Sequence, residues 1–268
     1  MYAYDDLLKD VKILLSLGYT EKIIAQTVYG RRISAFVRGE GAKILVVGAT
    51  HAREHVTAKL VVDLAKRYDG ENVAFIPMLN PDGVELAVHG IESAPVRYRD
   101  FLRKIRPNED FSTWKANGRG VDINVNYNAG WGRGRTNEFA PSYQNYVGEY
   151  PESETESRAS ADFVRENGIK VMLTYHAKGE VIYWSYNGVG DMAKAKKLSV
   201  ATGYDLAYAY QSHGGFKDWF LENGFGHAYT VEVGKDDFSY IELYKEYGDI
   251  LSQNQNVLTV LEEMLYDD

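Results

Sequence analysis

The chain has 268 residues, of which 45% are hydrophobic, and its formal net charge at pH 7 is -8. This is enough for one large α/β domain or two small ones, while the acidic balance argues against nucleic acid or an anionic membrane as a partner. The sequence contains no cysteine, which excludes disulfides and thiolate metal sites. Any metal ligands must come from six His and 38 Asp and Glu residues.

The sequence predicts neither a membrane span nor a signal peptide. No apolar run approaches the ~20 residues that a transmembrane helix needs. Residues 1–6 lack the basic and apolar segments of a signal peptide. We therefore expect a cytoplasmic location and no membrane span.

Helical and strand patterns alternate along the chain. Hydrophobic periodicity predicts an amphipathic helix over residues 5–17, a helix before Gly70, a polar helix that ends at Gly168 and one long final helix over 241–265. Short apolar runs predict strands at 33–37, 44–47, 73–78, 169–175, 181–184 and 228–233. This alternation indicates an α/β sheet covered on both sides. The one long irregular stretch, 107–151, is expected to be an active-site loop region of a single domain.

A candidate metal half-site, the segment HAREH at residues 51–55, follows the predicted strand 44–47. An imidazole and a carboxylate three residues apart are ligands that a borderline-soft ion such as Zn²⁺ accepts. In one interpretation His51 and His55 bind the metal from a continuous helix and Glu54 is the base. In the other, His51 and Glu54 are ligands and another His lies downstream; the Gly-Ala-Thr link before His51 favours this one. A metal-free His that caps a helix is the remaining alternative.

Two downstream residues stand out, one at the end of a predicted strand and one inside another. His176 follows the run 171–175, although a His in such a place is more often structural than a ligand. Glu232 interrupts an apolar run, where a carboxylate is costly unless it is paired or bound to metal. Burial would raise its pKa towards that of a general base.

The order of six motifs resembles the zinc metallocarboxypeptidases of the carboxypeptidase A type. The motifs span about residues 40–235, most of the chain. The resemblance implies an α/β fold in which a single zinc peptidase domain, residues 1–268, contains a mixed, twisted sheet of about eight strands with helices on both faces. In chain order the motifs are H-x-x-E at His51 and Glu54, N-P-D-G at 80–83, G-V-D-x-N at 120–124, His176, G-G-x-x-D-W at 214–219 and Glu232.

The resemblance also implies a role for individual residues. His51, Glu54 and His176 would bind one Zn²⁺ and leave the fourth position for water. Glu232 would take the proton from that water and pass it to the leaving amine. Tyr210 would be the mobile tyrosine that closes over the substrate, although a position in the core is nearly as well supported.

Two positions depart from the family pattern. The family uses an Arg to polarise the substrate carbonyl, and counting back from G-V-D-x-N places Lys115 there, with Arg119 as the alternative. Asp122 would orient a ligand or the loop. Asn124 would bind substrate, but Val125 follows it where typical carboxypeptidases have the Arg that binds the C-terminal carboxylate. An exopeptidase of the usual kind is therefore not expected.

Lys217 lies at the position that lines the leaving-group pocket in the family. A cation there would suit a leaving group with a carboxylate, and a solvated Lys at a helix start is the alternative. A subgroup, the bacterial γ-D-glutamyl-meso-diaminopimelate peptidases that cut cell-wall stem peptides, shows this combination, and segments 114–117 and 175–184 look like theirs. The resemblance thus implies a murein-peptide substrate. A conventional metallocarboxypeptidase and a non-catalytic module that binds wall fragments are the alternatives.

Overall fold

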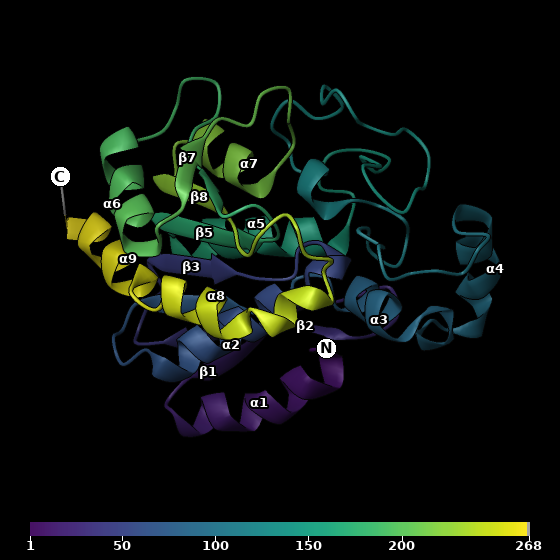
Figure 1. The fold of residues 1–268 in the computed structure, drawn as a ribbon, viewed down its shortest axis with the longest axis horizontal. Coiled ribbons are helices and arrows are strands. Elements are labelled where there is room, and N and C mark those ends of the chain that lie inside the picture. Colours follow the sequence, from purple (N-terminus) through teal and green to yellow (C-terminus); the bar gives the residue numbers. More distant parts are fainter. Residues whose placement is uncertain (267–268) are drawn as a thin grey trace.

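An eight-stranded sheet forms the centre of the protein, and the computed structural model describes residues 1–266 (Figure 1). In chain order the strands are β1 (Thr20–Gln26), β2 (Arg32–Arg38), β3 (Ile44–Val47), β4 (Val73–Ile76), β5 (Val171–His176), β6 (Val181–Tyr183), β7 (Asp205–Ala207) and β8 (His227–Glu232). They lie in the order β1-β2-β4-β3-β5-β8-β6-β7. The central strands β4, β3, β5 and β8 are parallel, whereas antiparallel pairs join β1 to β2, β2 to β4 and β8 to β6.

Helices cover both faces of this sheet. The α-helices are α1 (Tyr4–Ser16), α2 (Val56–Arg67), α3 (Pro81–His89), α4 (Val96–Ile105), α5 (Thr155–Asn167), α6 (Met192–Thr202), α7 (Phe216–Glu222), α8 (Tyr247–Asn254) and α9 (Val257–Tyr266), and the 3-10 helices are η1 (Ala52–Glu54), η2 (Ile91–Ser93), η3 (Ile123–Val125) and η4 (Glu242–Lys245). Side chains of α1, α2, α6, α8 and α9 share one hydrophobic core, and those of α5 and α7 share the other. The fold is therefore a single α/β domain with a mixed sheet, as the sequence predicts.

Strand β3 shows why its sequence is a continuous apolar run. Ile44 and Val46 belong to one core, while Leu45 and Val47 belong to the other. Successive side chains of a strand point to opposite faces, so a strand covered on both faces needs apolar residues at every position. All six predicted strands are present within two residues of their predicted bounds.

The prediction of one long final helix is wrong. Residues 241–265 form η4, α8 and α9 instead. The buried side-chain amide of Asn254 donates to the Ile250 carbonyl (2.8 Å) and to the hydroxyl of Tyr204 (3.1 Å). The bond to Tyr204 is a tertiary contact at the last residue of α8, and α9 begins separately at Val257.

The sequence predictions also omit some elements. The edge strands β1 and β7 are largely half-buried or exposed, so they lack the apolar runs that identify the inner strands.

None of the helices described in residues 1–266 combines the length and apolar character that crossing a bilayer requires. The irregular region 107–151 appears in Figure 1 as the teal loops beyond α7.

Candidate metal centre

Two neighbouring parallel strands, β3 and β5, bring the predicted metal ligands together. His176 is the last residue of β5, and His51 follows β3, which pairs with β5. The carboxyl ends of parallel strands form the usual ligand-binding edge of an α/β sheet. Gly48 allows the chain to turn there, because a Cβ at this position would lie 2.7 Å from the Pro77 carbonyl oxygen and 2.8 Å from that of Thr57. Glu54 closes η1, whose first turn begins directly after His51.

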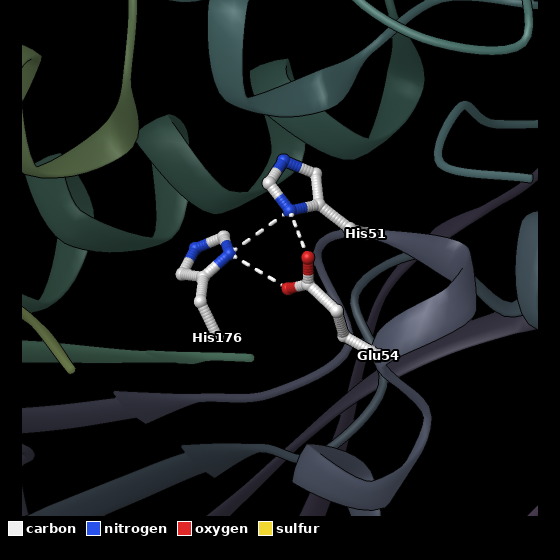
Figure 2. Close-up of side chains that lie close together, drawn as sticks. All are labelled: His51, Glu54 and His176. Atoms are coloured by element: carbon white, nitrogen blue, oxygen red, sulfur yellow. Dashed lines mark hydrogen bonds and ion pairs between the residues drawn. The ribbon is translucent and has the colours of Figure 1, made fainter. Parts of the chain in front are cut away.

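The three side chains point toward one another (Figure 2). His51 Nδ1 lies 2.8 Å from Glu54 Oε1, His176 Nδ1 lies 3.0 Å from Glu54 Oε2, and the two Nδ1 atoms are 3.0 Å apart. One ligand atom from each residue lies within 4.8 Å of the others, and all three residues are buried. Two imidazole nitrogens and a carboxylate at such a separation suit a divalent cation with tetrahedral preference.

The charge state of the cluster also fits a cation. Burial disfavours the ionised form of Glu54, but the adjacent His51 and His176 hold its pKa well below its ordinary value. Glu54 therefore stays a carboxylate, the form that binds metal. His55 points elsewhere: its Nδ1 lies 2.7 Å from the hydroxyl of Tyr244. The interpretation with His51 and His55 as joint ligands on one helix is excluded, because α2 begins only at Val56.

Asp122 connects the metal ligands to Lys115. This fully buried carboxylate lies 3.3 Å from His51 Nε2 and 2.8 Å from Lys115 Nζ, and it accepts hydrogen bonds from the backbone N–H groups of Asn124 (3.0 Å) and Asn145 (3.1 Å). Burial opposes its charge, but Lys115 and then His51 hold the pKa of Asp122 well below its ordinary value. The carboxylate thus orients the His51 ring and positions the Lys115 ammonium at once.

Glu232 lies beside His176. The two residues are register partners at the ends of β8 and β5. Desolvation raises the pKa of Glu232 to about 7, an increase that His176 opposes and the neighbouring Glu54 supports. A carboxyl with such a pKa, in contact with the cleft, can accept and return a proton near neutral pH.

A cavity of about 500 Å³ adjoins the cluster. Lys217 is buried, and its Nζ donates to the Ser185 carbonyl (2.8 Å) and to Asp218 Oδ1 (2.6 Å), which excludes the solvated-lysine alternative. Tyr210 is 83% exposed, which excludes a core position. Asn124 Oδ1 accepts from the Phe216 N–H (3.1 Å). The cavity is lined by residues that include His51, Lys115, Asn124, Tyr210, Lys217 and Glu232.

Arg119 lies in a different hollow from Lys115. Its guanidinium faces Glu149 (3.3 Å) and Glu154 (3.8 Å), and it lines a cavity with aromatic side chains such as Tyr146. This placement does not bring Arg119 together with the metal ligands. The geometry favours Lys115 as the cation for the substrate carbonyl.

Two residues near the centre were given no role from the sequence. Asn80, in the N-P-D-G motif that reads as a turn, caps α3 by accepting from the Gly83 N–H (3.0 Å), and its amide donates to the carbonyls of Thr50 (3.2 Å) and Ala116 (3.1 Å). It therefore fastens the loops that carry His51 and Lys115. Arg53 lies within the metal motif itself. Its position between the proposed ligands His51 and Glu54 is the sequence signal that could have identified it as part of the site.

The chain is similar in sequence to known zinc peptidases. A family model described as zinc carboxypeptidase matches residues 19–258. The chain is 27% identical over 261 residues to γ-D-glutamyl-L-diamino acid endopeptidase 1 of Lysinibacillus sphaericus, covering 87% of this chain and 65% of that protein. It is 32% identical over 243 residues to the uncharacterized protein YqgT of Bacillus subtilis (strain 168), covering 79% and 64%. The chain thus spans just under two thirds of the length of these relatives.

A solved structure shares the fold. Bovine thrombin-activatable fibrinolysis inhibitor, solved in complex with tick carboxypeptidase inhibitor, superposes with a TM-score of 0.78 at 18% sequence identity, covering 99% of this chain and 97% of that chain. At this identity the likeness concerns the arrangement of strands and helices.

Proposed function

The chain belongs to the zinc carboxypeptidase family, and we propose that it hydrolyses the amide bond between γ-D-glutamate and diaminopimelate in murein stem peptides. It is a hydrolase with one zinc site, formed by His51, Glu54 and His176. Zinc in this site supplies Lewis-acid activation of a water molecule and of the substrate carbonyl.

The side chains around the site account for the proton and charge movements. Glu232 accepts the proton of the attacking water and delivers it to the leaving amine. The Lys115 ammonium stabilises the negative charge that develops on the carbonyl oxygen. Asp122 holds that ammonium 2.8 Å away, and the same carboxylate orients the ring of His51. Tyr210, exposed at the rim, closes over the bound substrate.

The observation that carries the choice of substrate is the cleft's ion pair, Lys217 with Asp218, at 2.6 Å. Both residues are buried and line the cavity. The distal end of diaminopimelate carries an ammonium and a carboxylate, and a buried pair of opposite charges complements such a zwitterion. An ordinary C-terminal carboxylate would call for an unpaired cation, and Val125 cannot supply one.

The similarity to the Lysinibacillus endopeptidase supports the same substrate class. The chain spans only 65% of that protein, so the similarity concerns the aligned part alone. A conventional carboxypeptidase that releases C-terminal residues is the second candidate, favoured by the family as a whole.

Digestion of purified muropeptides, followed by mass spectrometry, separates the two candidates. The expected result is cleavage between D-glutamate and diaminopimelate with zinc-loaded protein, and none after chelation. Release of C-terminal residues from ordinary peptides, with the γ-D-glutamyl bond intact, would refute the proposal.

A further inference from the structure

A second hollow, of about 330 Å³, lies beside Arg119 and apart from the zinc cleft. Helix α4 contributes Tyr98 and Phe101 to its lining, the irregular region contributes Arg119, Tyr146 and Glu149, and Glu154 stands directly before α5. Among the described residues it shares no lining residue with the zinc cleft. Its volume falls within the range of about 300–1,000 Å³ that is usual for small-molecule pockets.

Three aromatic side chains, Tyr98, Phe101 and Tyr146, line this hollow. Tyr29 holds one of them in place: its ring packs against that of Tyr98 with 4.8 Å between the centroids, and its hydroxyl donates to the Gly118 carbonyl (2.7 Å). A cation near the face of an aromatic ring is attracted by the ring's quadrupole, most strongly where water is excluded. The hollow therefore offers surfaces that suit both an apolar group and a positive charge.

The hollow also contains a buried carboxylate. Glu154 is 2% exposed, and it accepts hydrogen bonds from Asn117 Nδ2 (2.9 Å) and Ser153 Oγ (2.9 Å). These neutral donors fix the carboxylate without neutralising its charge. Arg119 Nε lies 3.8 Å from it, and Arg119 Nη2 faces Glu149 at 3.3 Å. A buried carboxylate with so long an ion pair keeps part of its desolvation cost, and a positively charged ligand would offset that cost.

Negative charge exceeds positive charge around this hollow. Among its described lining residues, two carboxylates, Glu149 and Glu154, face one cation, Arg119. The same balance acts on Tyr146: burial raises the pKa of its hydroxyl, both carboxylates add to the increase, and Arg119 opposes it. A monovalent cation would balance these charges, whereas an anion would be repelled by the excess.

We propose that this hollow binds a small organic ammonium ion, with its charge at Glu154 and its apolar group among the aromatic rings. A primary amine on an aromatic or aliphatic group has this chemistry. A metal cation alone would leave the rings unused, and a neutral aromatic molecule would leave the charge of Glu154 unbalanced. The site goes beyond the proposed function, and it does not depend on which bond the zinc centre cleaves.

NMR titration of the zinc-loaded, isotope-labelled protein with tyramine and, separately, with 4-ethylphenol tests this proposal. The two probes share a phenol ring and a two-carbon chain, and only tyramine carries an ammonium. The amide shifts report where each probe binds, their saturation gives the Kd, and the same spectra show whether each variant is folded.

Tyramine is expected to shift the amides of residues 98–101, 118–121 and 146–154 and to bind about 10- to 100-fold more tightly than 4-ethylphenol. Glu154→Gln should remove most of this preference. Glu156→Gln is the matched control and should keep it, because Glu156 is also buried and also accepts from Asn117 Nδ2 (3.4 Å) but does not line the hollow.

A second variant tests the aromatic wall and leaves the buried carboxylates in place. Phe101 is half-buried on α4, and Phe101→Ala should weaken tyramine binding about 3- to 10-fold. Phe139→Ala should leave the Kd unchanged, because Phe139 is 69% exposed and does not line the hollow.

Four results would overturn the proposal: no saturable tyramine shifts, shifts confined to the zinc cleft, equal affinity for the two probes, or an unchanged preference in a folded Glu154→Gln protein. Should Glu154→Gln fail to fold, Phe101→Ala decides, and a wild-type Kd for tyramine in that variant overturns the proposal equally.

Discussion

Replacement of Lys115 by Met tests how charge on the substrate carbonyl is stabilised. The change removes the Lys115 ammonium, whose Nζ lies 2.8 Å from Asp122 Oδ2. Among the described residues, no other ammonium pairs with this carboxylate. Loss of one preorganised donor to a developing oxyanion typically costs about 10²–10³ in kcat. KM should change less, because the charge develops after the substrate has bound.

The same substitution also leaves Asp122 with an uncompensated charge. Breaking a buried ion pair typically destabilises a protein by about 3–5 kcal/mol. Lys115 is 17% exposed, and Asp122 keeps its contact with His51 and two backbone hydrogen bonds. We therefore expect a smaller loss, about 1–3 kcal/mol. The double variant Lys115→Met with Asp122→Asn should recover most of this stability but not the lost kcat.

The assay measures kcat and KM on a γ-D-glutamyl peptide, with thermal denaturation and zinc content recorded for each variant. Lys115→Arg should keep more activity than Lys115→Met, because it keeps the charge. Arg119→Gln serves as comparison and should stay within about threefold of wild type, since Arg119 faces Glu149 in another hollow. A folded, zinc-loaded Lys115→Met protein with wild-type kcat would refute the reasoning.

Three further predictions concern the other buried charges. Glu232→Gln should keep its zinc by elemental analysis and lose about 10²–10⁴ in kcat, and an active Gln variant would remove Glu232 as the base. In the wild type, kcat/KM should rise with pH as Glu232 loses its proton, with a midpoint below 7, because burial raises the pKa of Glu232 to about 7 and a bound cation lowers it again. His176→Ala should abolish zinc binding in equilibrium dialysis, whereas His55→Ala should retain it and lose about 1–3 kcal/mol of stability from its buried bond to Tyr244. The opposite result would favour the interpretation in which His51 and His55 are the zinc ligands. Burial raises the pKa of Glu156 to about 8, so the native state holds a proton that the unfolded chain releases near pH 4.5, and the free energy of unfolding should fall as pH rises from about 4.5 to 8. Glu156→Gln should flatten this fall and raise Tm at pH 8 by about 2–4 °C for each kcal/mol gained. An unchanged pH profile in the variant would contradict this prediction.

The zinc ligands could be predicted because the order of six motifs resembles one family, whereas the local signal of each residue left alternatives open. An apolar run followed by a polar, metal-binding residue identifies the end of a buried strand, and His51 and His176 both have this context. Glu232 has a different signal, a carboxylate inside an apolar run. The six inner strands were predicted because burial on one or both faces imposes a pattern that survives in the sequence.

The pairing of strands was decided only by the tertiary structure. Strands β5 and β8 are neighbours although α6, α7 and other elements separate them in the chain, and their register places His176 opposite Glu232. Contacts that depend on such pairing have no local signal. The break at Asn254 depends in the same way on the distant Tyr204 hydroxyl.

The sequence by itself determined which residues bind zinc, which carboxylate is the candidate base and which family the chain resembles. The structure placed Lys115 in the zinc cleft and Arg119 in another hollow, placed Lys217 in a buried ion pair, and left Arg53 without one among the described residues. The physical reason is that the sequence gives the chemical type of each side chain directly. Its charge partner and burial arise from segments that only folding brings together.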